Sequence, residues 1–326
     1  MSDAPAKKSP HALREARIPE ELAGQRFDQA LARLFPEYSR SRLTQWIKDG
    51  HARLDECVVR PRDAVMHGQR VRLEAVEEPR TDVTGEDLPL AIVYEDRALI
   101  VVNKPAGLVV HPGAGNRAGT LQNALLHHAP ELASLPRSGL VHRLDKDTSG
   151  LLAVARTLEA HTKLVAALQA REFEREYLAL VNGVMTGGGT VDAPVGRHAT
   201  DRLRMSVRED GREAVTHYRV LKRYRAHTQV AVQLDTGRTH QIRVHLAHIR
   251  YPIVGDQVYG RRLTLPPAAK PQLKEALQGF RRQALHARRL GLVHPVSGEP
   301  MRWEAPPPAD MQGLIAALED DLVHAR

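Results

Sequence analysis

The sequence contains a single cysteine, few aromatic residues and no long hydrophobic run, and each of these shortages excludes a class of protein. Cys57 has no partner in its own chain for a disulfide, and no Cys-x-x-Cys pair is present to hold a structural zinc ion. No stretch of eighteen apolar residues could cross a membrane as a helix. The first residues also lack the apolar core of a signal peptide. We therefore expect a cytoplasmic protein that does not act in a membrane.

Positive charge, in contrast, is present in excess. The 47 Lys and Arg residues outnumber the 39 Asp and Glu residues, which gives a formal net charge of +8. Residues 196–250 contain 12 of the basic residues and only 5 acidic ones. Such a concentration is typical of a surface that binds a polyanion, although short charge runs are more often simply solvated. With aromatic residues at only 4% of the chain, few other uses for the excess remain, so we favour nucleic acid as the partner.

The stretch from Gly139 to Thr157, GLVHRLDKDTSGLLAVART, gathers reactive side chains between two apolar flanks. We interpret it as a strand, a loop and a second strand, because catalytic groups often lie on loops held between buried elements. An aspartate beside Leu144 and an apolar strand should be partly desolvated, so Asp145 needs a cation, either Arg143 or a distant arginine. Residues 147–149 fit catalysis and simple turn capping equally well.

Two motifs of the chain resemble those of a known family. The run HRLDKDTSGLL is similar to the active-site motif of the RluA-type pseudouridine synthases, which isomerise uridine in ribosomal RNA, and GRTHQIRVH is similar to their second signature. The resemblance implies that Asp145 is the essential carboxylate and that Arg243 pairs with it. It also implies that Arg143 fills the gap left by the extruded uridine and that Tyr177 stacks on the uracil. Alternatively, Tyr177 is a core residue with a bonded hydroxyl.

The same two motifs supply further candidates for contacts with RNA. These are His142, Thr148, Arg238 and His240. Seventeen histidines also invite a metal hypothesis, but among His240, His245 and His248 only the last two share a helix face, so the spacing argues against a metal site. We predict no metal and no cofactor. The loop NKPAGLVVHPGAGN lacks a Gly-Lys-Ser/Thr ending, so we also predict no nucleotide cofactor.

Residues 18–78 have the pattern of a small basic domain. The apolar spacing from Phe27 predicts a helix that ends at Pro36, a second helix follows through Ile47 after Ser39 or Ser41, and two short strands come next. By physics alone, such a unit is as often structural as it is RNA-binding. It resembles the S-four RNA-binding domain, named after a ribosomal protein, and the resemblance implies that its second helix contacts RNA through Arg40, Arg42 and Lys48.

The predicted domain order places this unit between two flexible stretches. Residues 1–17 are small, polar and interrupted by proline, so we expect disorder there. Residues 79–88 are charged and lack hydrophobic periodicity, which predicts a flexible linker. Residues 89–326 then form the catalytic domain, with predicted helices after Thr120, Thr157 and Thr239 and over 310–323. Together with the resemblance, this pattern predicts an α+β fold with a mixed, largely antiparallel sheet and a cleft on one face.

Three functions fit these residues: an RNA isomerase, a non-catalytic RNA-binding ribosome assembly factor, and a hydrolase that uses Asp145 with Asp147 or a histidine. We favour the isomerase, because conversion of uridine to pseudouridine needs one carboxylate and no added group. The likeness extends over nearly the whole chain to a family member that modifies the loop of helix 69 in 23S ribosomal RNA. We therefore expect a monomer that acts on large-subunit ribosomal RNA and supports assembly of that subunit.

Overall fold

The computed structural model describes residues 11–36, 38, 40–76, 83–113, 115–201, 204–260 and 263–324. Contacts within the chain divide it into two compact units, Met1–Pro79 and Arg80–Arg326. Ser39, one of the two predicted helix caps, lies outside the described ranges, as does the side chain of Ser41. No helix in these ranges is both long enough and apolar enough to cross a membrane.

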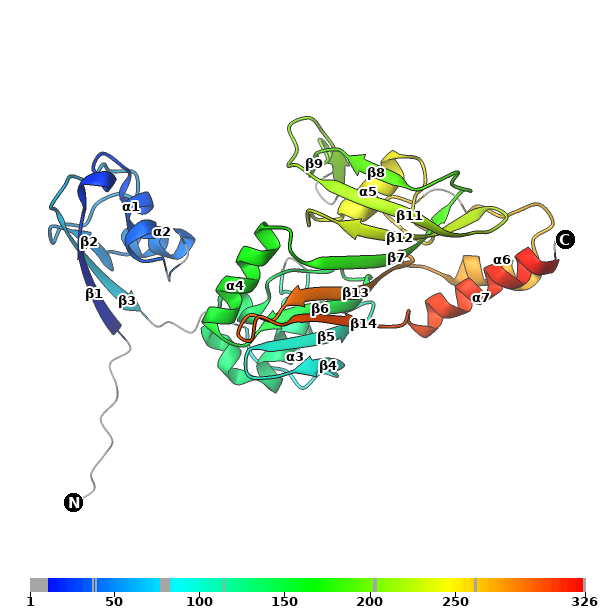
Figure 1. The fold of residues 1–326 in the computed structure, drawn as a ribbon, viewed down its shortest axis with the longest axis horizontal. Helices are drawn as coiled ribbons and strands as arrows, with labels where there is room; N and C mark the ends of the chain where they lie inside the picture. Colours follow the sequence, from blue (N-terminus) through cyan, green and yellow to red (C-terminus); the bar gives the residue numbers. More distant parts are fainter. Residues whose placement is uncertain are drawn as a thin grey trace, which may run out of the picture. The chain divides into compact units, whose positions relative to one another are not determined.

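The first unit packs two helices on a three-stranded antiparallel sheet of order β1-β3-β2 (Figure 1). Phe27 and Leu31 from the first helix and Leu43 and Ile47 from the second are fully buried against this sheet. The apolar stripe predicted for the first helix is thereby confirmed. Its elements are β1 (His11–Arg17), η1 (Glu20–Leu22), α1 (Phe27–Leu34), α2 (Arg40–Lys48), β2 (Ala52–Leu54) and β3 (Arg70–Val76).

The expectation of disorder is wrong for residues 11–17, while residues 1–10 lie outside the described ranges. Strand β1 pairs with β3 along its whole length, with His11 opposite Val76 and Arg17 opposite Arg70. Leu13 and its neighbours up to Glu15 are exposed, so backbone hydrogen bonds to a distant strand, rather than burial, hold this segment. The prediction of disorder relied on the low apolar content of this segment, and apolar content does not indicate backbone pairing with a distant strand.

The predicted linker, 79–88, is also not a free connection over its described part, residues 83–88. The backbone N–H of Glu86 donates to the carbonyl of Asn123 at 3.0 Å. The Asn123 side-chain amide in turn donates to the carbonyl of Thr84 at 2.8 Å. These bonds fasten residues 83–88 to the second unit, which begins before the predicted residue 89.

The second unit is built on one nine-stranded sheet of order β4-β5-β6-β13-β7-β12-β11-β8, with β14 beside the second half of β13 (Figure 1). Among the described strands of this sheet, only β6 and β13 pair in parallel, so the predicted mixed, largely antiparallel sheet is confirmed. The strands are β4 (Ile92–Glu95), β5 (Leu99–Lys104), β6 (Ser149–Ala155), β7 (Glu174–Asn182), β8 (Gly189–Asp192), β11 (Val215–Arg223), β12 (His227–Leu234), β13 (Leu285–Val293) and β14 (Pro300–Glu304).

Helices and a small hairpin complete the second unit. The hairpin of β9 (Val195–Arg197) and β10 (Met205–Val207) overlaps the start of the basic stretch 196–250. The helix α6 was not predicted, and it packs on the C-terminal helix α7. The helices are α3 (Leu121–His128), α4 (Leu158–Gln169), α5 (Gln241–His248), α6 (Pro271–Gly279) and α7 (Ala309–His324), with short 3-10 turns η2 (Pro130–Ser134) and η3 (Pro136–Gly139).

Strand β6 lies inside the sheet and all seven of its residues are buried. Leu152 packs in one core cluster with Leu125 of α3, while Leu151 packs in another with Leu164 of α4. Both faces of the strand are therefore covered, which explains why its sequence is continuously apolar. The strand is a rigid support for the polar loop that precedes it.

Two local predictions near the site were wrong. The segment before the loop is not a strand: Arg137 and Ser138 adopt left-handed φ values of 50° and 51° in the turn η3, and Leu140 then makes only an isolated bridge to Val154. Helix α5 is preceded by His240, not capped by Thr239. In contrast, the predicted Thr120 and Thr157 caps are confirmed at α3 and α4.

Candidate active site

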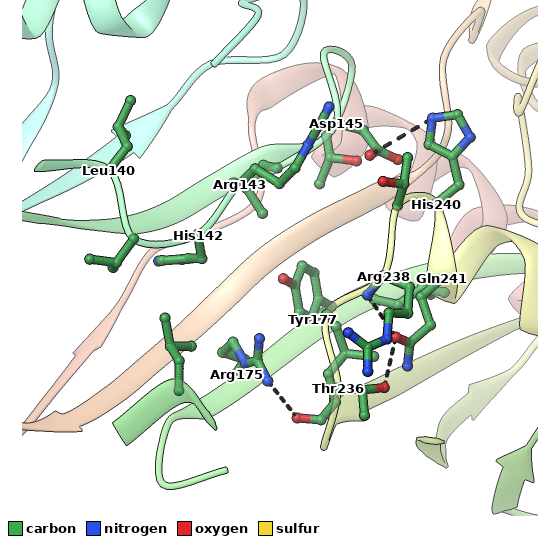
Figure 2. Close-up of a pocket in the computed structure, with 18 of the residues that line it drawn as sticks. Leu140, His142, Arg143, Asp145, Arg175, Tyr177, Thr236, Arg238, His240 and Gln241 are labelled. Carbon is green, nitrogen blue, oxygen red and sulfur yellow. Dashed lines mark hydrogen bonds and ion pairs between the residues drawn. The ribbon is translucent and has the colours of Figure 1, made fainter. Parts of the chain in front are cut away.

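A cavity of about 1230 Å³ opens in the second unit where the loop before β6 meets β7 and the start of α5. All eight predicted site residues of this unit contribute to its wall. Asp145, Arg143 and His240 can be followed in Figure 2. Ligand pockets typically measure about 300–1000 Å³, so this cavity is large enough for more than one nucleotide. The residues are His142, Arg143, Asp145, Thr148, Tyr177, Arg238, His240 and Arg243.

Asp145 and Arg243 form an ion pair at this cavity. The Nη1 of Arg243 donates to Oδ2 of Asp145 at 3.0 Å, across 98 positions of sequence. The predicted pairing of these two residues is therefore confirmed. The side chain of Asp145 is 15% exposed, whereas that of Arg243 is only 6% exposed. The carboxylate thus faces the cavity and the guanidinium lies behind it.

Asp256 is the second partner of this arginine. Its carboxylate, which is fully buried, accepts from Nε of Arg243 at 2.7 Å and from Nη2 at 2.9 Å. Burial would raise the pKa of Asp256, but the hydrogen bonds from Arg243 hold it below its usual range. Burial would also lower the pKa of Arg243, yet the bonds and charge of Asp256, with the charge of Asp145, raise it. The guanidinium stays charged and fixed in orientation.

A buried lysine anchors the chain immediately after Asp145. The Nζ of Lys104 donates to the carbonyl of Lys146 at 2.9 Å and to two carbonyls of the glycine-rich loop that follows β5. Burial lowers the pKa of Lys104 to about 7, against the charges of Asp147 and Asp145. One side chain therefore ties the two loops beside the cavity together.

The other end of the Asp145 loop is fixed to strand β13. Gly150 has a φ of 120°, and a Cβ at this position would lie 2.3 Å from the carbonyl oxygen of Ala287, so the close approach of the two strands requires glycine. The hydroxyl of Ser149 bonds to Nδ1 of His286 at 2.9 Å. Ser149 is therefore buried and structural.

His240 lies at the turn before helix α5, beside Asp145. Its Nε2 is 4.0 Å from Oδ1 of Asp145, and its Nδ1 bonds to the hydroxyl of Tyr259 at 2.8 Å. Burial lowers the pKa of His240, against the attraction of Asp145. The left-handed φ of 57° at His240 directs the chain into the helix that carries Arg243.

His142 does not act as an exposed cation. Its Nε2 accepts a hydrogen bond from the backbone N–H of Ala153 in β6 at 2.9 Å, which requires an unprotonated nitrogen. Burial, with the nearby charge of Arg175, lowers the pKa of His142 to about 3. The ring contributes to the cavity wall as a neutral group that holds the loop on β6.

Thr148 is also unsuited to the RNA contact expected of it. The residue is 2% exposed and its hydroxyl accepts from Nε2 of Gln283 at 3.1 Å. Its backbone N–H donates to the carbonyl of Asp145 at 3.1 Å and closes the turn. Of the two interpretations that the sequence left open here, turn formation is the one that the geometry supports.

Tyr177, Arg143 and Arg238 approach the cavity from three different elements (Figure 2). Tyr177 belongs to β7, is buried, and has its pKa raised by that burial. Arg143 is exposed, two residues before Asp145. The Nε of Arg238 donates to the carbonyl of Glu213 at 2.9 Å. Their proposed contacts with RNA remain predictions.

The three candidates of the first unit differ in their surroundings. Arg40 donates to the buried carboxylate of Asp28 at 2.9 Å, so its charge also stabilises the fold. The guanidinium of Arg42 lies 5.4 Å from the ring centroid of Trp46. Lys48 is exposed. Binding of RNA by these residues remains a prediction.

Sequence reasoning assigned no role to Asp256, Tyr259 or Lys104. The signal for Asp256 was its place after Ile253 and Val254, since a carboxylate in an apolar run needs a cation. No group of three or more His, Cys, Asp or Glu side chains in the described part of the chain is placed to hold a metal ion.

Comparison with known proteins extends this picture. Residues 98–248 match a family model described as RNA pseudouridylate synthase. The chain is 56% identical over 325 residues to ribosomal large subunit pseudouridine synthase D of Xanthomonas campestris. The matched region covers 100% of this chain and 98% of that protein. The identity is 58% over 308 residues with the protein of that name from Pseudomonas aeruginosa, covering 94% and 96% of the two chains.

Solved structures agree with this result. The structure of human RNA pseudouridylate synthase domain containing 4 shares 28% identity with this chain at a TM-score of 0.55, covering 70% of this chain and 93% of that one. The chain therefore belongs to the RNA pseudouridylate synthase family and has the fold of these isomerases. Within the family it is of the RluA type, and its full-length similarity is to the ribosomal large subunit pseudouridine synthases D, the RluD group.

Proposed function

We propose that this protein converts uridines of large-subunit ribosomal RNA to pseudouridine, with Asp145 as the catalytic carboxylate. The observation that carries the proposal is the ion pair of Asp145 with Arg243 at the wall of a large cavity. Arg243, held by Asp256, pairs with the carboxylate of Asp145 and keeps it aimed at the cavity. A carboxylate in this state is the one group that the isomerisation requires.

The reaction breaks the bond between N1 of uracil and C1′ of the ribose and forms a bond between C5 and C1′. The C5 proton leaves and N1 gains a proton, so atoms and charge balance without a redox step. Asp145 begins the reaction either by attack on C1′ or by removal of the C2′ proton. Both routes need the carboxylate ionised beforehand, and both need uracil held while it rotates, which suits Tyr177 at the cavity wall.

The proposed target is the loop of helix 69 in 23S ribosomal RNA. Relatives at 52–58% identity bear the name ribosomal large subunit pseudouridine synthase D, which supports a substrate in that subunit. A loop base is the easiest to unstack, because extrusion from a helix costs a few kcal/mol. The enzyme would act in the cytoplasm, with its first unit adding affinity for the RNA.

The test is to map pseudouridines in ribosomal RNA by carbodiimide-blocked primer extension, in cells with the gene, without it, and with the Asp145→Asn variant. We expect the helix 69 modifications to be absent from the last two strains and transfer RNA to be unchanged. Modification by the Asp145→Asn enzyme would refute the catalytic assignment. Loss at another site, with helix 69 intact, would refute the target alone.

The same strains separate the enzyme from a non-catalytic assembly factor. An assembly factor would restore subunit assembly, and leave pseudouridine at its normal level, whichever residue stands at 145. Purified Asp145→Asn protein should still bind the RNA fragment, because aspartate and asparagine have nearly the same shape.

A further inference from the structure

A buried arginine on β7 contributes to the wall of the cavity, and no carboxylate among the described residues is paired with it. Arg175 is 8% exposed. Its Nη2 donates to the carbonyls of Leu234 and Asp235 at 3.2 and 3.4 Å, and no partner of its Nε is found among the described residues. Burial of a charge without a counter-charge generally costs several kcal/mol. An anionic ligand bound beside Arg175 would offset this cost.

The surrounding chain leaves room for this guanidinium. Gly237 lies in the turn after β12, and a Cβ there would be only 3.1 Å from Nη1 of Arg175. The two carbonyl bonds orient the guanidinium without neutralising it. Arg175 is therefore a fixed cation at the wall of the cavity, in no ion pair with the described residues.

The position of Arg175 relative to Tyr177 separates two parts of the cavity. The two residues are two apart on β7, so they lie on the same face of the strand roughly 7 Å apart. In Figure 2, Tyr177 lies between Arg175 and Asp145. A uracil that stacks on Tyr177 and reaches Asp145 leaves the Arg175 end for another part of the RNA.

Further arginines line the same cavity, and one of them, Arg238, follows the Gly237 that borders Arg175. Arg171, Arg212 and Arg238 contribute to its wall. Burial and the charges of Arg212 and Arg171 act to lower the pKa of Arg238, which shows that these cations are close enough to repel one another. Two carboxylates also lie here, but Glu213 is paired with Arg171 at 2.5 Å and Asp235 with His217 at 3.1 Å.

We propose that Arg175, with Arg212 and Arg238, binds the backbone phosphate of a nucleotide adjacent to the target uridine. The inference rests on the proposed function, since it identifies a second part of the same RNA substrate. A phosphodiester supplies the missing negative charge and has acceptor oxygens for guanidinium donors. The second contact fixes the position of the target nucleotide over Asp145.

The test replaces single phosphates of a short RNA stem-loop by neutral methylphosphonates, at each of three linkages on either side of the target uridine. Dissociation constants are measured for the wild-type protein and for Arg175→Met, which keeps an unbranched side chain. We expect the wild type to lose about tenfold in affinity at one linkage. Arg175→Met should bind the unmodified RNA about tenfold more weakly and lose nothing further at that linkage.

Two more variants keep the result interpretable. Arg212 is exposed, so Arg212→Met should fold normally and show reduced sensitivity at the same linkage even if Arg175→Met is unstable. Arg219→Met, an exposed arginine outside the cavity wall, should keep the full wild-type sensitivity. The salt slope of log affinity should fall by roughly 0.7 for Arg175→Met, since one phosphate contact is lost.

Equal losses at every linkage in the wild type, Arg175→Met and Arg212→Met would overturn the inference, because no phosphate would then depend on these arginines. Failure of the proposed function gives a different result. In that case the wild-type protein would neither bind the stem-loop with measurable preference nor convert its uridine to pseudouridine.

Discussion

Asp256 holds the guanidinium of Arg243 with two hydrogen bonds, of 2.7 Å from Nε and 2.9 Å from Nη2, so that Nη1 is directed at Asp145. One buried carboxylate thus orients a cation for another carboxylate that faces the substrate. The side chains of Asp256 and Arg243 are 0% and 6% exposed, so water cannot compensate for the loss of either charge.

The first prediction is that Asp256→Asn impairs both catalysis and stability. The amide cannot balance the charge of Arg243, which would then be drawn closer to Asp145. We expect the single-turnover rate to fall about a hundredfold and the free energy of unfolding to fall by about 3 kcal/mol. Rates of pseudouridine formation and urea denaturation measure the two effects.

A matched control for this variant is Asp210→Asn. Asp210 accepts from Nε and Nη2 of Arg208 at 2.7 and 2.9 Å, the same geometry, but its side chain is 71% exposed. We expect little loss of stability and an unchanged rate, because solvent screens an exposed pair. If the two variants behaved alike, burial of the Arg243 pair would not be the cause.

The second prediction concerns His142 and pH. Its pKa is about 3 in the folded protein and about 6.5 in an unfolded chain, so the unfolded state binds one more proton between these values. The stability from His142 is fully present above pH 6.5 and is lost as the pH falls towards 3. The wild type should therefore lose its stability advantage over His142→Asn as the pH is lowered.

Urea denaturation of both proteins at several pH values measures this difference. The difference in the free energy of unfolding should change by about 1.4 kcal/mol per pH unit in the middle of the range between the two pKa values, and should be constant at higher pH. Other buried histidines, such as His227, titrate in both proteins, so their contributions to the difference in stability cancel. A difference that does not change with pH would show that His142 is not held neutral.

The third prediction is that Arg143 acts in extrusion of the uridine and not in bond cleavage. Arg143 is exposed, and Asp145 already has its cation in Arg243. Arg143→Ala should therefore lose much more activity on a folded stem-loop than on an RNA whose target uridine is already unstacked. Single-turnover rates on the two RNAs test this, and equal losses would count against the assignment.

The fourth prediction is that the first unit supplies affinity and not chemistry. The described residues that line the Asp145 cavity belong to the second unit. A protein lacking residues 1–79 should keep its rate at saturating RNA but bind more weakly. Its salt slope should be lower by roughly 0.7 to 0.9 for each phosphate contact removed. An unchanged slope would refute this division of labour.

Local sequence was enough for most helices and for the active-site motifs. The caps at Thr120 and Thr157 and the apolar stripe of α1 depend on residues three or four positions apart, so their pattern is visible in the chain. The continuous apolar run of β6 also indicated a buried strand correctly. The Asp145–Arg243 pair came from the family resemblance, since no local pattern joins residues 98 positions apart.

The tertiary structure alone decided what each polar side chain does at the site. Thr148 and His142 occur within one motif with Asp145, yet the first bonds to Gln283 and the second to the backbone of β6. Only Asp145 remains directed at the cavity with a charged partner behind it. Burial and hydrogen bonding depend on distant segments, which a sequence pattern does not place in space.

The same reason explains the segments that were misjudged. Residues 11–17 are polar and look unstructured by composition, but β3, more than fifty positions away, supplies their hydrogen-bond partners. Asp256 and Arg175 carry charges whose roles follow from what lies beside them: a guanidinium beside the first, and two backbone carbonyls beside the second. Sequence determined the chemistry available to this protein, and folding decided which charges are neutralised and which are left for RNA, because electrostatic free energy depends on distance and desolvation.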